Sequence, residues 1–167
     1  MSTATIDGAA SYRKTTLDSG MRVVTRAMPH TYSVSISLFV GVGSRYESVE
    51  RSGVSHVVEH LVVHSGTRSY APREAFQALQ QRSIANAETL ATFVHYDLVL
   101  PADQLEVALK LEFERLTSVA FSARILAEEV PRCLQEVVSV ETTPQASLMK
   151  FGLMGLNQVA RHGAQVA

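Results

Sequence analysis

His56-Val57-Val58-Glu59-His60 is the stretch of this 167-residue chain that decides how the rest is interpreted. Residues four apart on a helix share a face, so the rings of His56 and His60 point the same way. At that separation both imidazoles can reach one zinc ion at about 2 Å each. Glu59 lies beside His60, where its carboxylate can take a proton from a zinc-activated water. The stretch therefore predicts a zinc site with Glu59 as general base.

A third ligand has to come from elsewhere, because a catalytic zinc usually has three protein ligands and one open position. The best candidate is Glu136, within Leu134-Gln135-Glu136-Val137-Val138. Glu129 lies about two turns earlier on the same helix face, and we expect it to orient a histidine ligand from the second shell. The alternative is that His56 and His60 are neighbours on a solvated face, which the surrounding valines fit poorly. We expect one zinc ion per chain.

Strands with alternating apolar residues indicate a sheet around this helix. The clearest runs from Ser33 to Val42, where every second residue is apolar and serines occupy other positions. Met21 to Thr25 forms a shorter strand, and Ala85 to Leu100 forms two short strands or one long bent strand. Helices are expected over about residues 53–63, 72–81, 103–117, 122–140 and 145–159. This order predicts an α+β fold, with helices packed on one face of a mainly antiparallel sheet.

The helix after Pro101 has a specific expected start and a specific buried face. Asp103 and Glu106 have the spacing of a capping box. The residues expected on its apolar face are Leu105, Ala108, Leu109, Phe113 and Leu116.

Composition restricts the possible partners and location. The formal net charge of −1 provides no basic field for a nucleic-acid backbone, so we expect no nucleic-acid partner. The single cysteine, Cys133, cannot form an internal disulfide and is expected to be a core thiol. No signal peptide or membrane-spanning run is evident, so we expect a cytoplasmic protein without membrane contact. Residues 1–14 are expected to be a flexible lead-in, and residues 15–167 a single domain.

Several segments, in order, resemble the pitrilysin family, which includes insulinase and mitochondrial processing peptidase. Residues 17–24 resemble its opening turn and strand, and residues 42–47 its glycine-ended second strand. Residues 53–61 carry the H-x-x-E-H zinc helix. Asn86-Ala87-Glu88-Thr89 resembles its substrate-edge strand, and Glu136 stands at roughly the family's separation for the third ligand. The resemblance covers about residues 15–160.

The resemblance implies a zinc-dependent endopeptidase. His56, His60 and Glu136 would hold zinc, while Glu59 would activate water and then pass the proton to the leaving amine. The substrate would be a peptide or protein segment in extended conformation, added as a strand along Asn86, Ala87, Glu88 and Thr89. The family also implies a second pitrilysin-type domain, or a homo- or hetero-oligomeric partner.

The chain departs from the family pattern at four features. Arg82-Ser83 replaces a usual Gly-Gly pair, and His64 adds one residue between the zinc helix and Gly66-Thr67. His64 is expected to be a helix-end or partly buried histidine. Pro131 should kink the helix between Glu129 and Glu136. The chain is also shortened at its C-terminal end, which leaves two alternatives: a non-catalytic subunit or peptide-binding scaffold of the same fold, and a truncated remnant.

Overall fold

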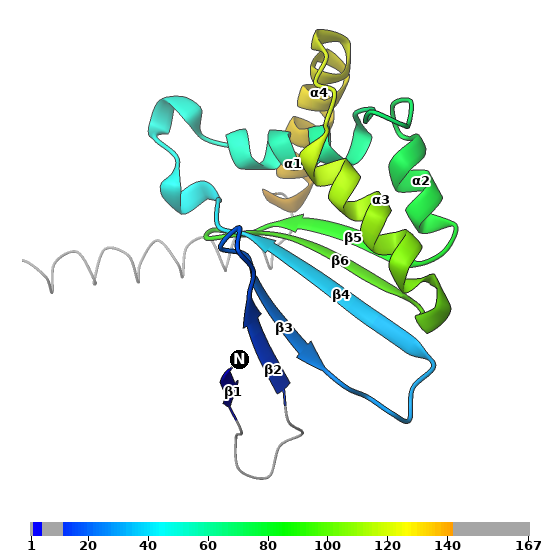
Figure 1. Ribbon diagram of the computed structural model, residues 1–167. Coiled ribbons are helices and arrows are strands. Elements are labelled where there is room, and N and C mark those ends of the chain that lie inside the picture. The colour runs from blue at the N-terminus through cyan, green and yellow to red at the C-terminus, as the bar shows by residue number, and fades with distance from the viewer. Residues whose placement is uncertain (1, 5–11, 142–167) are drawn as a thin grey trace, which may run out of the picture.

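The strands form two antiparallel sheets in the computed structural model, which describes residues 2–4 and 12–141 (Figure 1). β1 (Ser2–Ala4), β2 (Tyr12–Thr16) and β3 (Arg22–Arg26) form the first sheet in that order. The second sheet has the order β4-β6-β5, with β6 in the centre. Its strands are β4 (Ser33–Val40), β5 (Ile84–Thr89) and β6 (Val94–Pro101).

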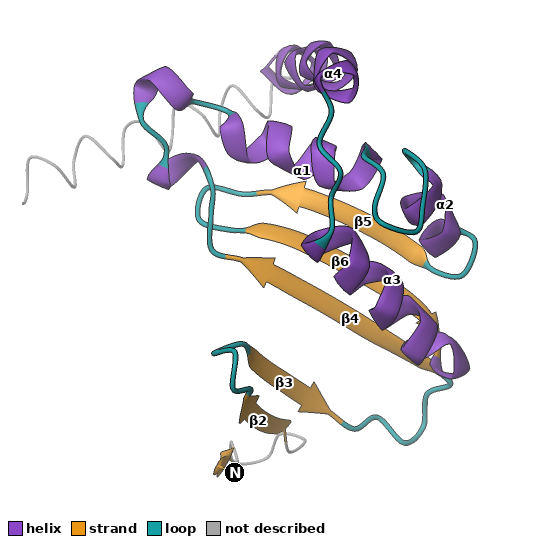
Figure 2. Ribbon diagram, turned by 45° about the horizontal axis from the view of Figure 1, so that its top comes forward, coloured by secondary structure: helices purple, strands orange, loops and turns teal. Residues whose placement is uncertain are grey.

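Four helices lie on one side of the second sheet (Figure 2). They are α1 (Val54–His64), α2 (Glu74–Gln80), α3 (Leu105–Thr117) and α4 (Ala123–Glu141). Short 3-10 turns cover Ser44–Tyr46, Val49–Arg51 and Ala102–Gln104. The α+β prediction is confirmed, and the segment 84–101 is two strands rather than one. None of the described helices is long and apolar enough to cross a membrane.

The core lies between β6 and the helices. Val94, Tyr96, Leu98 and Leu100 are all buried on one face of β6 because side chains alternate along a strand. Leu98 and Leu100 pack with residues of α2 and α3, whereas Val94 and Tyr96 pack with Val62 and Val63 of α1. This second cluster fixes α1 against the sheet, with its opposite side available for other contacts.

The buried face of α3 differs from the prediction. Ala108, Leu111, Glu112 and Arg115 are buried, whereas Phe113 is 36% exposed. Glu112 and Arg115 can face the core because they neutralise each other: Arg115 Nη2 donates to Glu112 Oε1 over 2.6 Å. The guanidinium also lies 5.0 Å from the ring centroid of Tyr96. The predicted capping box is also wrong, because Gln104 is the N-cap residue of α3 and makes no side-chain cap bond.

Three other expectations concern the two ends of the chain and Pro131, and Gly43 adds a further constraint. Ser2–Ala4 pairs with residues 12–14, so these parts of the expected lead-in form strands. Main-chain pairing stabilises them although their side chains are small or polar. α4 continues through Pro131. At Gly43, a Cβ atom would lie 2.7 Å from the carbonyl oxygen of Ala91, which explains the glycine. The helix expected over residues 145–159 lies outside the described residues.

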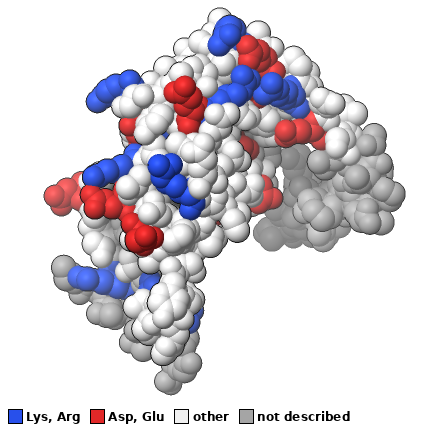
Figure 3. All heavy atoms as spheres, turned by 90° about the vertical axis from the view of Figure 1, so that its right-hand side faces the viewer, with Lys and Arg blue, Asp and Glu red and all other residues white. Residues whose placement is uncertain are grey.

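Acidic and basic side chains are intermixed on the face shown in Figure 3. That face, as far as its residues are described, carries no continuous field of one charge sign. The distribution agrees with the near-neutral net charge of the sequence.

Candidate metal centre

The helix that carries the candidate ligands begins at a charged cap. Gly53 precedes α1 in the left-handed conformation, with φ of 90°. The Glu47 carboxylate accepts hydrogen bonds from the main-chain N–H groups of Gly53 and Ser55, each over 2.7 Å. A carboxylate at a helix N-terminus satisfies free N–H groups and interacts favourably with the helix dipole. Glu47 therefore fixes the start of the helix.

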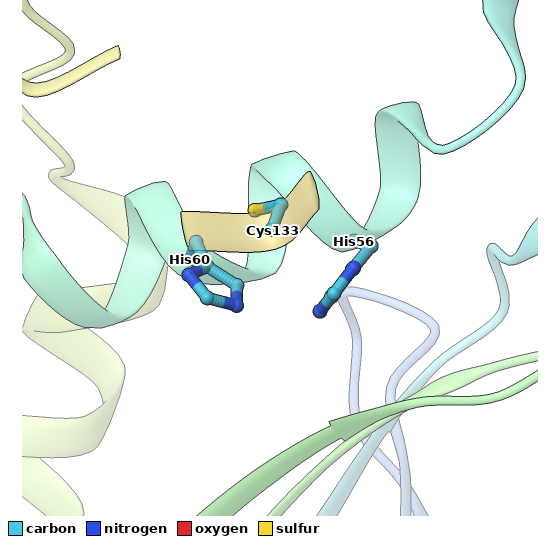
Figure 4. Close-up of side chains that lie close together, drawn as sticks. All are labelled: His56, His60 and Cys133. Carbon is cyan, nitrogen blue, oxygen red and sulfur yellow. The ribbon is translucent and has the colours of Figure 1, made fainter. Parts of the chain in front are cut away.

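His56 and His60 project on the same side of α1, as their spacing predicts (Figure 4). Their ring centroids are 4.8 Å apart. Glu136 reaches them from α4: its Oε2 lies 3.3 Å from His56 Nε2 and 3.3 Å from His60 Nε2. Ligands of a tetrahedral zinc, each about 2 Å from the metal, lie about 3.3 Å from one another. The two nitrogens and one oxygen thus have a separation that suits zinc.

Cys133 of α4 lies beside the same two histidines (Figure 4). Its sulfur and a nitrogen of each histidine lie within 4.8 Å of one another. The side chain is buried, and this burial, together with the negative charges of Glu136 and Glu129, raises the pKa of the thiol to about 11. Before any metal binds, Cys133 is therefore a neutral buried thiol.

Glu129 is fully buried behind His60. One oxygen, Oε2, lies 3.3 Å from His60 Nδ1, and the other accepts hydrogen bonds from Arg73 and Arg132. Burial alone would raise the pKa of Glu129, but the His60 hydrogen bond and the nearby positive charges lower it below its ordinary value. An ionised acceptor at Nδ1 places the His60 proton there. The Nε2 lone pair, on the side of Glu136, is then available to a metal ion.

Glu59 lies next to the end of β5. It is 7% exposed, and its Oε2 accepts a hydrogen bond from Thr89 Oγ1 over 2.9 Å. Along β5, the side chains of Ala85 and Ala87 pack toward the helices. Asn86 and Glu88 are exposed on the opposite face of the sheet. Of the four predicted substrate-binding residues, the structure therefore brings only the side chains of Ala87 and Thr89 to the side of α1.

β5 is an edge strand of its sheet. Among the described residues it pairs with β6 alone, so one side of its main chain is available for a further strand. This edge ends at Thr89, in contact with the candidate base.

Comparison with known proteins identifies the family. The family model described as Insulinase (Peptidase family M16) matches residues 22–165. The chain belongs to the insulinase family of peptidases. An uncharacterized zinc protease of Mycobacterium tuberculosis is 31% identical over 152 residues, which cover 89% of this chain and 34% of the relative. The alpha-1 subunit of mitochondrial-processing peptidase from Dictyostelium discoideum is 25% identical over 142 residues, covering 84% of this chain and 21% of that subunit.

The fold is shared with a solved protease from Helicobacter pylori. The TM-score is 0.68 at 24% sequence identity, covering 80% of this chain and 31% of the other. The insulinase-family chain thus spans about a third of the length of the first relatives it matches. The similarity to the pitrilysin and insulinase family inferred from the sequence is confirmed.

Three residues near α1 make contacts that the sequence analysis did not predict. Glu47 caps α1, Arg73 binds Glu129, and the last residue of α1, His64, places Nδ1 at 3.0 Å from Glu129 Oε2. His64 is one turn beyond His60, and this spacing could have indicated a shared partner. Arg73 offered no signal, because its role depends on a left-handed conformation that is unusual for arginine.

Proposed function

We propose that this chain is the zinc-bearing part of an insulinase-family endopeptidase that hydrolyses peptide bonds. One observation carries the proposal: a single oxygen of Glu136 lies 3.3 Å from both His56 Nε2 and His60 Nε2. The three ligand atoms come from two helices that are distant in sequence, and the buried Glu59 directly precedes His60 on α1. Metal-dependent peptide hydrolysis uses a metal ion to activate water and a general base to take the proton of that water.

Each residue has a distinct role in the proposed reaction. His56, His60 and Glu136 hold the metal, and Glu129 orients His60 through Nδ1. When bound, zinc supplies a Lewis acid that lowers the pKa of water and polarises a carbonyl oxygen. Glu59 takes a proton from the attacking water and delivers it to the leaving amine. The Thr89 hydroxyl, which donates to Glu59 Oε2, keeps this carboxylate oriented.

The substrate proposed is an extended peptide that pairs with β5. Main-chain hydrogen bonds along Asn86–Thr89 would hold it, in a mode that depends more on backbone than on side chains. Because β5 ends beside Glu59, a peptide added there runs past the base. The family resemblance and the open strand edge both support this binding mode.

A direct test combines metal analysis with peptide cleavage. Purified chain is expected to contain about one zinc per molecule and to lose it to a chelator. Glu59→Gln should keep the zinc and lose cleavage, whereas Glu136→Ala should lose zinc. Glu106→Gln is a matched control, because Glu106 is exposed on α3 and pairs there with Lys110, away from the candidate site. Zinc-free protein whose metal content is unaffected by Glu136→Ala would refute the site.

We also propose that cleavage requires a second domain or partner chain. The proposal rests on the family and on the share of its relatives that this chain spans. Cleavage measured with and without an added partner domain tests it. A stable monomer with full activity alone would exclude this requirement while leaving the metal site intact.

A further inference from the structure

Glu129 connects the proposed zinc site to the rest of the fold. Its Oε2 faces His60 Nδ1, and its Oε1 accepts from Arg132 Nη1 over 2.9 Å and from Arg73 Nη2 over 3.2 Å. Arg132 belongs to the same helix as Glu129, three residues further on, so it cannot tie that helix to another element. From outside α4, His60 and His64 face Glu129 Oε2, and Arg73 is the arginine that reaches the other oxygen, Oε1.

The backbone of Arg73 is held in an unfavourable conformation. Its φ of 71° makes it the one non-glycine residue with positive φ among residues 2–4 and 12–141. Left-handed backbone is costly for a side chain with a Cβ and persists where the surrounding contacts enforce it. The Arg73 N–H donates to the carbonyl oxygen of His64, the last residue of α1, over 3.0 Å.

The side chain of Arg73 continues from this anchor to α4. Nη2 donates to Glu128 Oε2 over 2.9 Å as well as to Glu129 Oε1. One residue thus joins the C-terminal end of α1 to two adjacent carboxylates of α4. The two linked helices are those that supply His60 and Glu136.

Pro131 makes this connection more important. It lies inside α4 between Glu129 and Glu136, and a proline lacks the N–H that would continue the helix ladder. The orientation of the Glu136 segment therefore depends more on side-chain contacts than it would in an uninterrupted helix.

We infer that Arg73 is a positioning residue of the metal centre, which fixes Glu129 against His60 and aligns α4 so that Glu136 meets both histidines. The inference rests on the zinc site proposed above. Arg73 touches neither metal nor substrate in this role, since it acts through Glu129.

The test uses variants of the full chain that keep the left-handed backbone. Arg73→Gly and Arg73→Asn both accept positive φ, so they remove the guanidinium without adding strain. Zinc affinity is measured by competition with a chelator, and the visible spectrum of bound Co²⁺ reports the ligand geometry. Loss of an outer contact to a ligand typically weakens metal binding about 10- to 100-fold, so we expect about tenfold weaker zinc binding and an altered Co²⁺ spectrum.

Two controls separate positioning from general stability or charge. Arg132→Ala removes a cation from the same Glu129 oxygen without removing the link to α1, and should weaken zinc binding less than either Arg73 variant. Arg73→Lys keeps the charge and should restore part of the affinity. Thermal melts identify the variants that remain folded. If Arg73→Gly does not fold, Arg73→Asn provides the test of the inference.

The two proposals fail in different ways. Wild-type chain that takes up neither zinc nor Co²⁺ would overturn the proposed function. If the wild-type chain binds zinc, the role of Arg73 alone can still fail. It is overturned if folded Arg73→Gly or Arg73→Asn binds zinc within about twofold of wild type and shows an unchanged Co²⁺ spectrum.

Discussion

Replacing Glu47 with glutamine should destabilise the protein by loosening the start of the metal-bearing helix. The carboxylate accepts two main-chain hydrogen bonds of 2.7 Å, from Gly53 and Ser55. Glutamine has a single acceptor oxygen, and its NH₂ group would face an N–H donor. The variant thus loses one hydrogen bond and the charge that complements the helix dipole.

The expected cost is about 1–2 kcal/mol, the range observed when a helix-capping acceptor is lost. For a chain of this size, that corresponds to a fall in Tm of about 2–8 °C. Glu50→Gln is the matched control, since it removes the same charge three residues further on. Glu50 does not contact α1 in the described hydrogen bonds, so a change within about 0.5 kcal/mol is expected.

The effect of Glu47 should depend on pH. Partial burial alone would raise the pKa of Glu47, but its hydrogen bonds with Ser55 and Gly53 lower it below the ordinary value of 4.5. A folded-state pKa below the unfolded value means that the carboxylate stabilises the fold above the unfolded pKa. This stabilisation is lost as the pH falls through the folded pKa. Thermal melts at pH 7 and near pH 3 measure it. Equal Tm values for wild type and Glu47→Gln at pH 7 would refute the assigned cap. So would a Tm difference between the two proteins that is as large near pH 3 as at pH 7.

Other predictions concern the core and the buried thiol. Leu98→Ala, at a 1% exposed position, should cost about 2–5 kcal/mol in urea denaturation, and an unchanged midpoint would contradict its place in the core. Glu112→Gln should cost about 3–5 kcal/mol because it leaves the Arg115 charge buried without its partner. Lys110→Ala, which breaks an exposed ion pair on the same helix, serves as its control and should cost under about 0.5 kcal/mol. Cys133 should resist alkylation in the folded chain at pH 8 and react readily in urea, because burial raises its pKa to about 11. Rapid alkylation of folded chain would show that the thiol is accessible.

Much of the fold followed from periodicity in the sequence. The serine-alternating strand from Ser33 and the helix expected from residue 122 were both evident from local patterns. The structure adds that the Ser122 hydroxyl accepts a hydrogen bond from the N–H of Ile125. The buried face of α3 was not, because hydrophobicity rules place charged residues outside. Glu112 and Arg115 are inside because each satisfies the other at short range, a pairing that periodicity does not encode.

Some features of the candidate site also follow from local sequence, and others do not. The geometry of His56 and His60 follows from helical spacing, and the structure brings Glu136 and Glu129 to them as the spacing from the family resemblance suggested. Their roles in binding zinc stay predictions. The contact between Thr89 and Glu59 depends on the register of β5 with β6, and the reach of Arg73 depends on its backbone angle. Neither quantity can be obtained from local sequence.

The edge of β5 that no described strand covers has a consequence for how the chain behaves in concentrated solution. An edge that accepts a peptide strand does not distinguish a substrate from the strand of a neighbouring molecule. Ile84, at the start of β5, is 74% exposed, and no charged residue precedes Glu88 on the strand to oppose such pairing. We therefore expect edge-to-edge self-association to compete with the proposed peptide binding, more strongly at higher protein concentration and less strongly as peptide is added.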